Sequence, residues 1–153
     1  MRRTRRARTG TRVLTAASAA ALLALVGVTG CTEEAQQKAG DIVSSATSAA
    51  ASAAQEKMNE VKDGVNATEE VKAGPTKVDG DRTTAEITAT NPQDKSADYT
   101  VMVNFRDSGG NLLDAVVLNI DGVEAGKSKS GTARSNRTLS GETKAEVAQA
   151  LRH

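Results

Sequence analysis

The sequence predicts a mainly β protein whose folded domain is a small antiparallel sandwich of six or seven strands. From about Val71 onward, apolar and polar residues alternate, which is the period of a strand with one buried and one wet face. These runs are short, and turn-forming residues separate them at intervals of about 8–12 residues, as in sandwich folds. One Tyr, one Phe and no Trp among 153 residues leave material for only a modest core.

The alternation defines the individual strands. Segment 97–107 is the clearest, and it places Tyr99 and Phe105 on one apolar face, where core packing is favoured over a stacking platform for sugar or peptide. Segment 143–152 also has high helix propensity, but we expect a strand with Val147 and Leu151 facing inward. The expected strands are 71–81, 83–91, 97–107, 112–120, 128–139 and 143–152. Pro75 marks the first of them as an edge strand or a bulge.

The first 30 residues predict a signal for export. Six Arg and no acidic residue occupy residues 1–30, and an apolar run of roughly 16 residues follows the Arg-rich start, shorter than the ~20 that a stable membrane span needs. The run ends in Val28-Thr29-Gly30-Cys31, which holds the only cysteine. Small residues directly before a cysteine resemble the lipobox of bacterial lipoprotein precursors. The resemblance implies cleavage between Gly30 and Cys31 and lipidation of the Cys31 thiol.

Lipidation would anchor the chain to a bilayer without crossing it. Two or three acyl chains anchor stably, whereas one is marginal. We therefore expect a signal peptide at 1–30, a lipidated tether at 31–70 and the sandwich at 71–153, held on the cell membrane and facing away from the cytoplasm. The Arg pairs leave both the general secretory route and twin-arginine export open.

The tether is rich in Ala and Ser and is expected to be partly helical. Its apolar residues recur at spacings of three and four, namely Val43, Ala46, Ala50, Ala54, Met58, Val61 and Val65. This face is thin, because Ala buries little surface. It predicts a spacer that lifts the domain off the bilayer, or alternatively a helix that self-associates or lies on a partner.

The β-rich part resembles the FxLYD-type immunoglobulin-like domain of bacterial surface proteins over roughly residues 71–153. The shared features are an Asn-Pro turn, a V-x-F-x-D strand end, a Gly-containing hairpin, an apolar pair and a later x-x-G turn. In this sequence they are Asn91-Pro92, Val103 to Asp107, Gly109-Gly110, Leu112-Leu113 and Ala125-Gly126. The resemblance implies an immunoglobulin-like fold and a surface location, and it implies no reaction.

Little in the sequence points to catalysis or to a cofactor. The only histidine, His153, is the last residue, where a frayed end orients a general base or metal ligand poorly. Asp79-Gly-Asp81 has calcium-like spacing but lacks the remaining ligands, so a turn is favoured. Asn136-Arg-Thr138 matches a glycosylation sequon that we attribute to chance. We expect no enzyme and no cofactor.

The charge balance disfavours one class of partner and leaves others open. From Cys31 onward, 14 basic residues face 19 acidic ones, so nucleic-acid binding is disfavoured. A short basic run of Lys127, Lys129, Arg134 and Arg137 is expected to be a solvated strand face, or alternatively to dock an anionic wall polymer.

The function expected is that of an anchored envelope lipoprotein with a binding or structural module. Its partners would be the bilayer, through acylated Cys31, and an envelope protein or wall polymer, contacted through the loops at 91–97, 107–112 and 121–127. The alternative is a small-ligand-binding lipoprotein that is accessory to transport or sensing.

Overall fold

The computed structural model describes residues 33–153. The signal peptide and the Gly30–Cys31 junction lie outside the described residues. The described elements, in chain order, are α1 (Glu33–Asn59), β1 (Val65–Asn66), the 3-10 turn η1 (Thr68–Glu70), β2 (Val71–Asp79), β3 (Arg82–Thr90), β4 (Ala97–Asp107), β5 (Leu112–Val123), β6 (Ser128–Arg134) and β7 (Thr143–Arg152).

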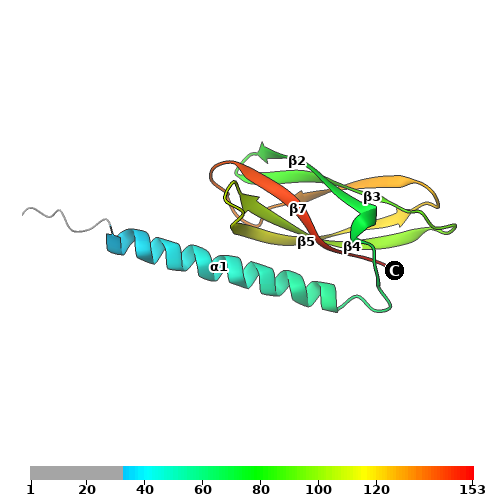
Figure 1. Ribbon diagram of the computed structural model, residues 1–153, viewed down its shortest axis with the longest axis horizontal. Helices are drawn as coiled ribbons and strands as arrows, with labels where there is room; N and C mark the ends of the chain where they lie inside the picture. The colour runs from blue at the N-terminus through cyan, green and yellow to red at the C-terminus, as the bar shows by residue number, and fades with distance from the viewer. Residues whose placement is uncertain (1–32) are drawn as a thin grey trace, which may run out of the picture.

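The strands form two antiparallel sheets that face each other (Figure 1). Sheet A has the order β1-β7-β4-β5, and sheet B has the order β2-β3-β6. The mainly β prediction is therefore confirmed, and each expected strand has a counterpart. The segment with helix propensity, 143–152, is the strand β7, because it is paired with β4 along its length and with β1 at its end. Tertiary pairing here overrides local propensity.

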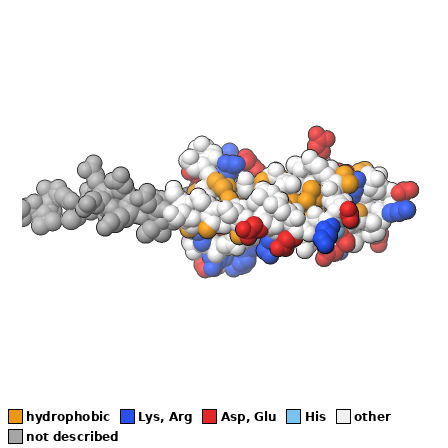
Figure 2. Space-filling view, turned by 90° about the horizontal axis from the view of Figure 1, so that it is seen from below, with side chains coloured by type: hydrophobic (Ala, Val, Ile, Leu, Met, Phe, Trp, Pro, Cys, Tyr) orange, Lys and Arg blue, Asp and Glu red, His pale blue; other side chains and the backbone are white. Residues whose placement is uncertain are grey.

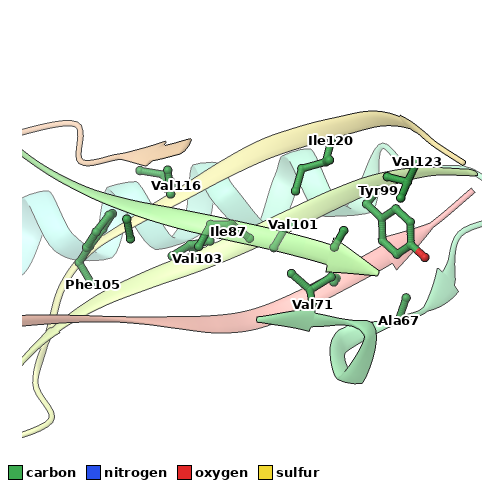
Figure 3. Packing of buried hydrophobic residues seen from close by; sticks show 14 residues of the cluster. Ala67, Val71, Ile87, Tyr99, Val101, Val103, Phe105, Val116, Ile120 and Val123 are labelled. Atoms are coloured by element: carbon green, nitrogen blue, oxygen red, sulfur yellow. The ribbon is translucent and has the colours of Figure 1, made fainter. Parts of the chain in front are cut away.

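The core lies between the sheets, as Figure 3 shows. Tyr99 and Phe105 are both fully buried there, so their predicted core placement is confirmed. Val101 and Val103 lie between them on the same face of β4 and are also fully buried. Sheet B contributes Ile87 and the small residues Ala85, Ala89 and Ala133 to the facing layer.

Two of the irregular strands, β2 and β7, differ in how well their sequence predicted them. The register of β2 shifts between Ala73 and Thr76, so the bulge expected at Pro75 is present on an edge strand. In β7 the register shifts between the partners of Met102 and Val103, which a regular two-residue period does not anticipate. The shift leaves Val147 against the core and turns Leu151 to the opposite face, where it lies close to Gly64. The inward placement expected for Leu151 is therefore wrong.

The segment before residue 71 contacts the sandwich instead of standing apart from it. Helix α1 runs along the outer face of sheet A and contacts β5 and β4 (Figure 1). Val65 and Asn66 pair with the end of β7, and Ala67 is buried in the core cluster. Residues 65–70, expected in the tether, are thus hydrogen-bonded into the folded body.

The direction of α1 gives the body two distinct ends. The near end, toward which the N-terminus of the helix points, consists of connections 80–81, 108–111 and 135–142. The far end consists of 91–96, 124–127 and His153. The Thr47 hydroxyl donates to the Leu113 carbonyl (3.2 Å) at the near end, so the turns of α1 before Thr47 extend past the body (Figure 1).

Candidate functional site

The three loops expected to form one contact surface lie at opposite ends of the body. Residues Ala97 and Val123 are cross-strand partners, which brings loops 91–97 and 121–127 together at the far end. The hairpin 107–112 closes the other end of the same two strands. The expectation of one surface from all three loops is therefore wrong, because consecutive antiparallel connections alternate between the ends of a sheet.

One buried side chain, Asn91, holds both far-end loops. Its amide Nδ2 donates to the carbonyls of Lys95 (2.7 Å) and Val123 (2.8 Å). Its side-chain oxygen accepts from the Gln93 backbone (3.0 Å), which forms the turn around Pro92. Its backbone N–H donates to the Lys127 carbonyl, and its carbonyl accepts from Gly126, both at 2.9 Å. The sequence revealed the Asn-Pro turn but not the contacts that join the two loops.

The chain's last residue is also fixed at the far end. The backbone N–H groups of Asp98 and His153 each donate to the other residue's carbonyl, at 3.0 Å. The ring Nε2 of His153 lies 3.2 Å from the Thr100 hydroxyl. The expectation of a frayed histidine is therefore wrong. Within residues 33–153, no group of three or more His, Cys, Asp or Glu is placed to hold a metal ion.

A groove beside His153 lies between sheet A and the C-terminal end of α1 with the residues that follow it. It has a volume of about 590 Å³, and its lining residues are Lys57, Glu60, Val61, Lys62, Thr100, Val117, Asn119 and His153. Within the described part of the chain, the side chains of Lys57, Lys62 and Asn119 form no hydrogen bond or ion pair, so they are free to meet a ligand. Figure 2, which views the body from the helix side, shows acidic and basic side chains mixed over the far end.

A polar cluster lies just inside the far end. The Tyr99 hydroxyl donates to Glu70 (2.6 Å), and the Arg152 guanidinium pairs with the same carboxylate. Burial raises the pKa of Tyr99 to about 12, with further contributions from the hydrogen bond to Glu70 and from its charge, while Arg152 acts in the opposite direction. The phenol therefore stays protonated and ties β4 to η1 and β7.

A second polar cluster organises the near end. Asp114 is fully buried, and its carboxylate accepts from the Asn136 backbone (2.6 Å), the Asn136 amide (3.2 Å) and the Ala115 backbone (2.9 Å). The Arg137 guanidinium donates to the Thr47 hydroxyl and to the Leu113 carbonyl, which joins the helix to this end. The side-chain amide of the sequon asparagine, Asn136, is thus engaged in hydrogen bonds within the protein.

The expected basic run does not form a single patch. Lys129 donates to the Asp121 carbonyl (2.6 Å), and Arg134 pairs with Asp79 (2.7 Å). Arg137 reaches the helix at the near end, whereas Lys127 belongs to a far-end turn. These cations point to different partners, so the structure does not gather them for an anionic polymer.

Asp79 and Asp81 flank a tight turn at Gly80, which has a φ of +63°. Their carboxylates face arginines: Asp81 lies 3.5 Å from Arg82 and 3.8 Å from Arg134. The turn interpretation of the Asp-Gly-Asp motif therefore fits the geometry.

Three edge strands, β2, β5 and β6, carry features that hinder pairing with another strand. Pro75 and its bulge interrupt β2, and Lys129 lies on the inward-facing side of the edge strand β6. On the edge strand β5, the Asn136 amide occupies the Ala115 carbonyl (3.1 Å) and Arg137 occupies that of Leu113. Bulges, inward charges and prolines are the devices that block edge-to-edge association. These three edge strands are therefore poorly suited to backbone pairing with a partner strand.

Comparison of the chain with protein-family models, with curated proteins and with solved structures gave no match. Within residues 33–153, no helix combines the length and apolar character that crossing a membrane requires.

Proposed function

We propose that this protein is an envelope lipoprotein, anchored to the outer side of the cell membrane through acylated Cys31, that presents an immunoglobulin-like binding module. The signal-like start and the lipobox resemblance at Val28–Cys31 support the anchor. Two facing antiparallel sheets support the sandwich. A role in binding or structure is proposed in place of catalysis.

The direction of α1 is the structural observation that supports the proposal, because it sets which end of the body would face the bilayer. The helix begins at Glu33, two residues after Cys31, and its N-terminus points beyond the near end of the body (Figure 1). From Glu33 to Thr47 it rises about 21 Å. The longest strand, β5, then spans roughly 40 Å of body. A lipid on Cys31 would therefore place the near end toward the bilayer and the far end away from it.

The far end is the proposed binding surface, with an envelope protein as its partner. Asn91 fixes loops 91–97 and 121–127 against each other, so little conformational entropy is lost when they bind. Both signs of charge occur on this surface, which suits a polar protein contact better than a uniformly charged polymer.

Two measurements test this proposal. Metabolic labelling with a fatty-acid analogue should mark the native protein, and a Cys31→Ser variant that still incorporates label would contradict the anchor. Crosslinking and mass spectrometry of the native protein should then identify a partner protein. The Asp94→Arg variant, changed at the far end, should no longer crosslink to that partner. The matched change Glu142→Arg at the near end should leave it bound. Equal loss from both variants would contradict the far-end surface.

The second candidate function, small-ligand binding as an accessory to transport or sensing, is supported by the groove beside His153. Its volume of about 590 Å³ suits a small molecule. Thermal-shift screening against small metabolites tests it, because a ligand that binds only the folded state raises the unfolding temperature. A shift that survives Asn119→Ala combined with Lys62→Gln would place the ligand elsewhere.

A further inference from the structure

The chain reverses direction at residues 60–64, and this turn makes the position of α1 decide the orientation of the body. The helix ends short of the far end, and residues 60–64 carry the chain on to β1, which pairs with the last residues of β7 beside His153. While α1 lies on sheet A, the far end points away from the helix N-terminus. If α1 left the sheet, the body would be suspended from its far end, and the near end would be free to swing outward.

The helix contacts the sheet through β5 and β4. Of the α1 side chains from Ser44 onward, those buried are Thr47, Ala54 and Met58. Beneath them, Ala115 and Thr100 lie on the outer face of sheet A, where the helix leaves them 2% and 6% exposed. At the near end, Arg137 and the Leu113 carbonyl hold Thr47.

This interface is separate from the core. Neither Ala54 nor Met58 belongs to the cluster between the two sheets. Releasing α1 would therefore expose the outer face of sheet A without opening the main core, which is the condition for local opening at less than the full cost of unfolding.

The reversing turn fits closely in the docked state. A Cβ on Gly64 would lie 3.0 Å from Val61 Cγ1 and 3.1 Å from Leu151 Cβ, so only glycine fits there without displacement. Asp63 adopts a φ of +58°, a left-handed conformation that non-glycine residues rarely take. A glycine at position 64 therefore lets the turn pass close to β7 while α1 is docked.

We propose that α1 is a releasable strut whose docking on sheet A selects the end of the body that faces away from the anchor. Docking itself follows from the contacts above, whereas its consequence for orientation rests on the proposed lipidation of Cys31. The strut would thus regulate whether the far-end surface is presented.

Adjacent alanines provide a matched test of docking. Ala54 is 4% exposed, whereas Ala53 faces solvent. Hydrogen exchange followed by mass spectrometry on the full chain should show α1 amides exchanging faster than those of β4. Ala54→Gln should lower α1 protection by about tenfold or more through overpacking, with β4 unchanged, and Ala53→Gln should not. The proposal would be overturned if α1 and β4 amides exchanged at the same rate in the unaltered protein. It would also be overturned if Ala54→Gln and Ala53→Gln lowered α1 protection equally.

Orientation is measured separately on the lipidated protein in vesicles. Fluorophores on Ser108→Cys and Glu124→Cys, at the near and far ends, report distance from a lipid-borne quencher. We expect stronger quenching at residue 108, and loss of that difference in Ala54→Gln. A difference that persists in Ala54→Gln would overturn the strut's control of orientation. Failure of the protein to associate with vesicles would instead contradict the anchor, while the exchange result would stand.

Discussion

Asn91→Ala is the change expected to disturb the far end most. The substitution removes two donated hydrogen bonds and the acceptor for Gln93. The Val123 carbonyl is buried, so leaving it unpaired costs about 1–3 kcal/mol, and the more accessible bond to Lys95 adds about 1 kcal/mol. We therefore expect a loss of about 2–4 kcal/mol in the free energy of unfolding.

Urea unfolding of the full chain measures this loss, with hydrogen exchange locating it. Loops 91–97 and 121–127 should both lose protection, since the same side chain bonds to each. Asn91→Asp keeps the acceptor but sets a carboxylate against two carbonyl oxygens, so it should cost at least as much. Asn119→Ala, at an exposed asparagine, should stay within about 0.5 kcal/mol of the unaltered protein. If Asn91→Ala also stayed within about 0.5 kcal/mol, the role assigned to Asn91 in holding the two far-end loops together would be refuted.

Three further predictions concern single groups. Because Tyr99 is the only tyrosine and no Trp is present, the tyrosinate absorbance should report its pKa directly, near 12 in the folded state. The folded protein holds the Tyr99 proton more tightly than the unfolded chain does. The contribution of Tyr99 to the free energy of unfolding is therefore complete below pH 10 and falls as the pH rises toward 12. A titration midpoint at 10 would contradict the burial of the phenol and its hydrogen bond to Glu70. Hydrogen bonds from Asn111 hold the pKa of Asp107 below its usual range. The stabilisation of the 107–112 hairpin should therefore be complete above the ordinary Asp pKa and be lost as the pH falls through the lowered pKa of Asp107. A carbon-13 titration of the Asp107 carboxyl group measures this pKa, and an unshifted value would contradict the prediction. Gly131→Ala would place a Cβ 2.9 Å from a Leu118 methyl and should cost about 1–3 kcal/mol in urea unfolding, whereas an unchanged midpoint would show that the sheets have room to separate.

The sequence predicted the strands well because each carries its own alternating pattern. Segment 97–107 is an example: its period of two placed Tyr99 and Phe105 on the same buried face. The same rule failed at Leu151, because the register shift in β7 reverses which face of the sheet each later side chain occupies. Such a shift depends on how the partner strand fits, and a single strand's sequence does not contain that information.

The helix shows a different limit. Its existence followed from composition and spacing, and Ala54 and Met58 lie on the predicted apolar face and are buried. Ala46, on the same predicted face, is exposed, while Thr47 is buried beside it. The sheet carbonyl and the arginine that meet Thr47 come from residues far along the chain, so they set the helix rotation in a way that helical periodicity cannot reveal.

The polar clusters follow from the thinness of the core. Sheet B contributes Ala85, Ala89 and Ala133 to it, so the apolar contacts at the middle of the body are small. Each end is instead fixed by a buried polar side chain, Asn91 at one and Asp114 at the other, and each hydrogen-bonds across connections that are distant in sequence. Hydrogen bonds are directional where apolar contacts are not, so such ends hold a defined shape with little hydrophobic surface. The far end, although made of loops, is thus held in one shape by hydrogen bonds, which is what the proposed binding surface requires.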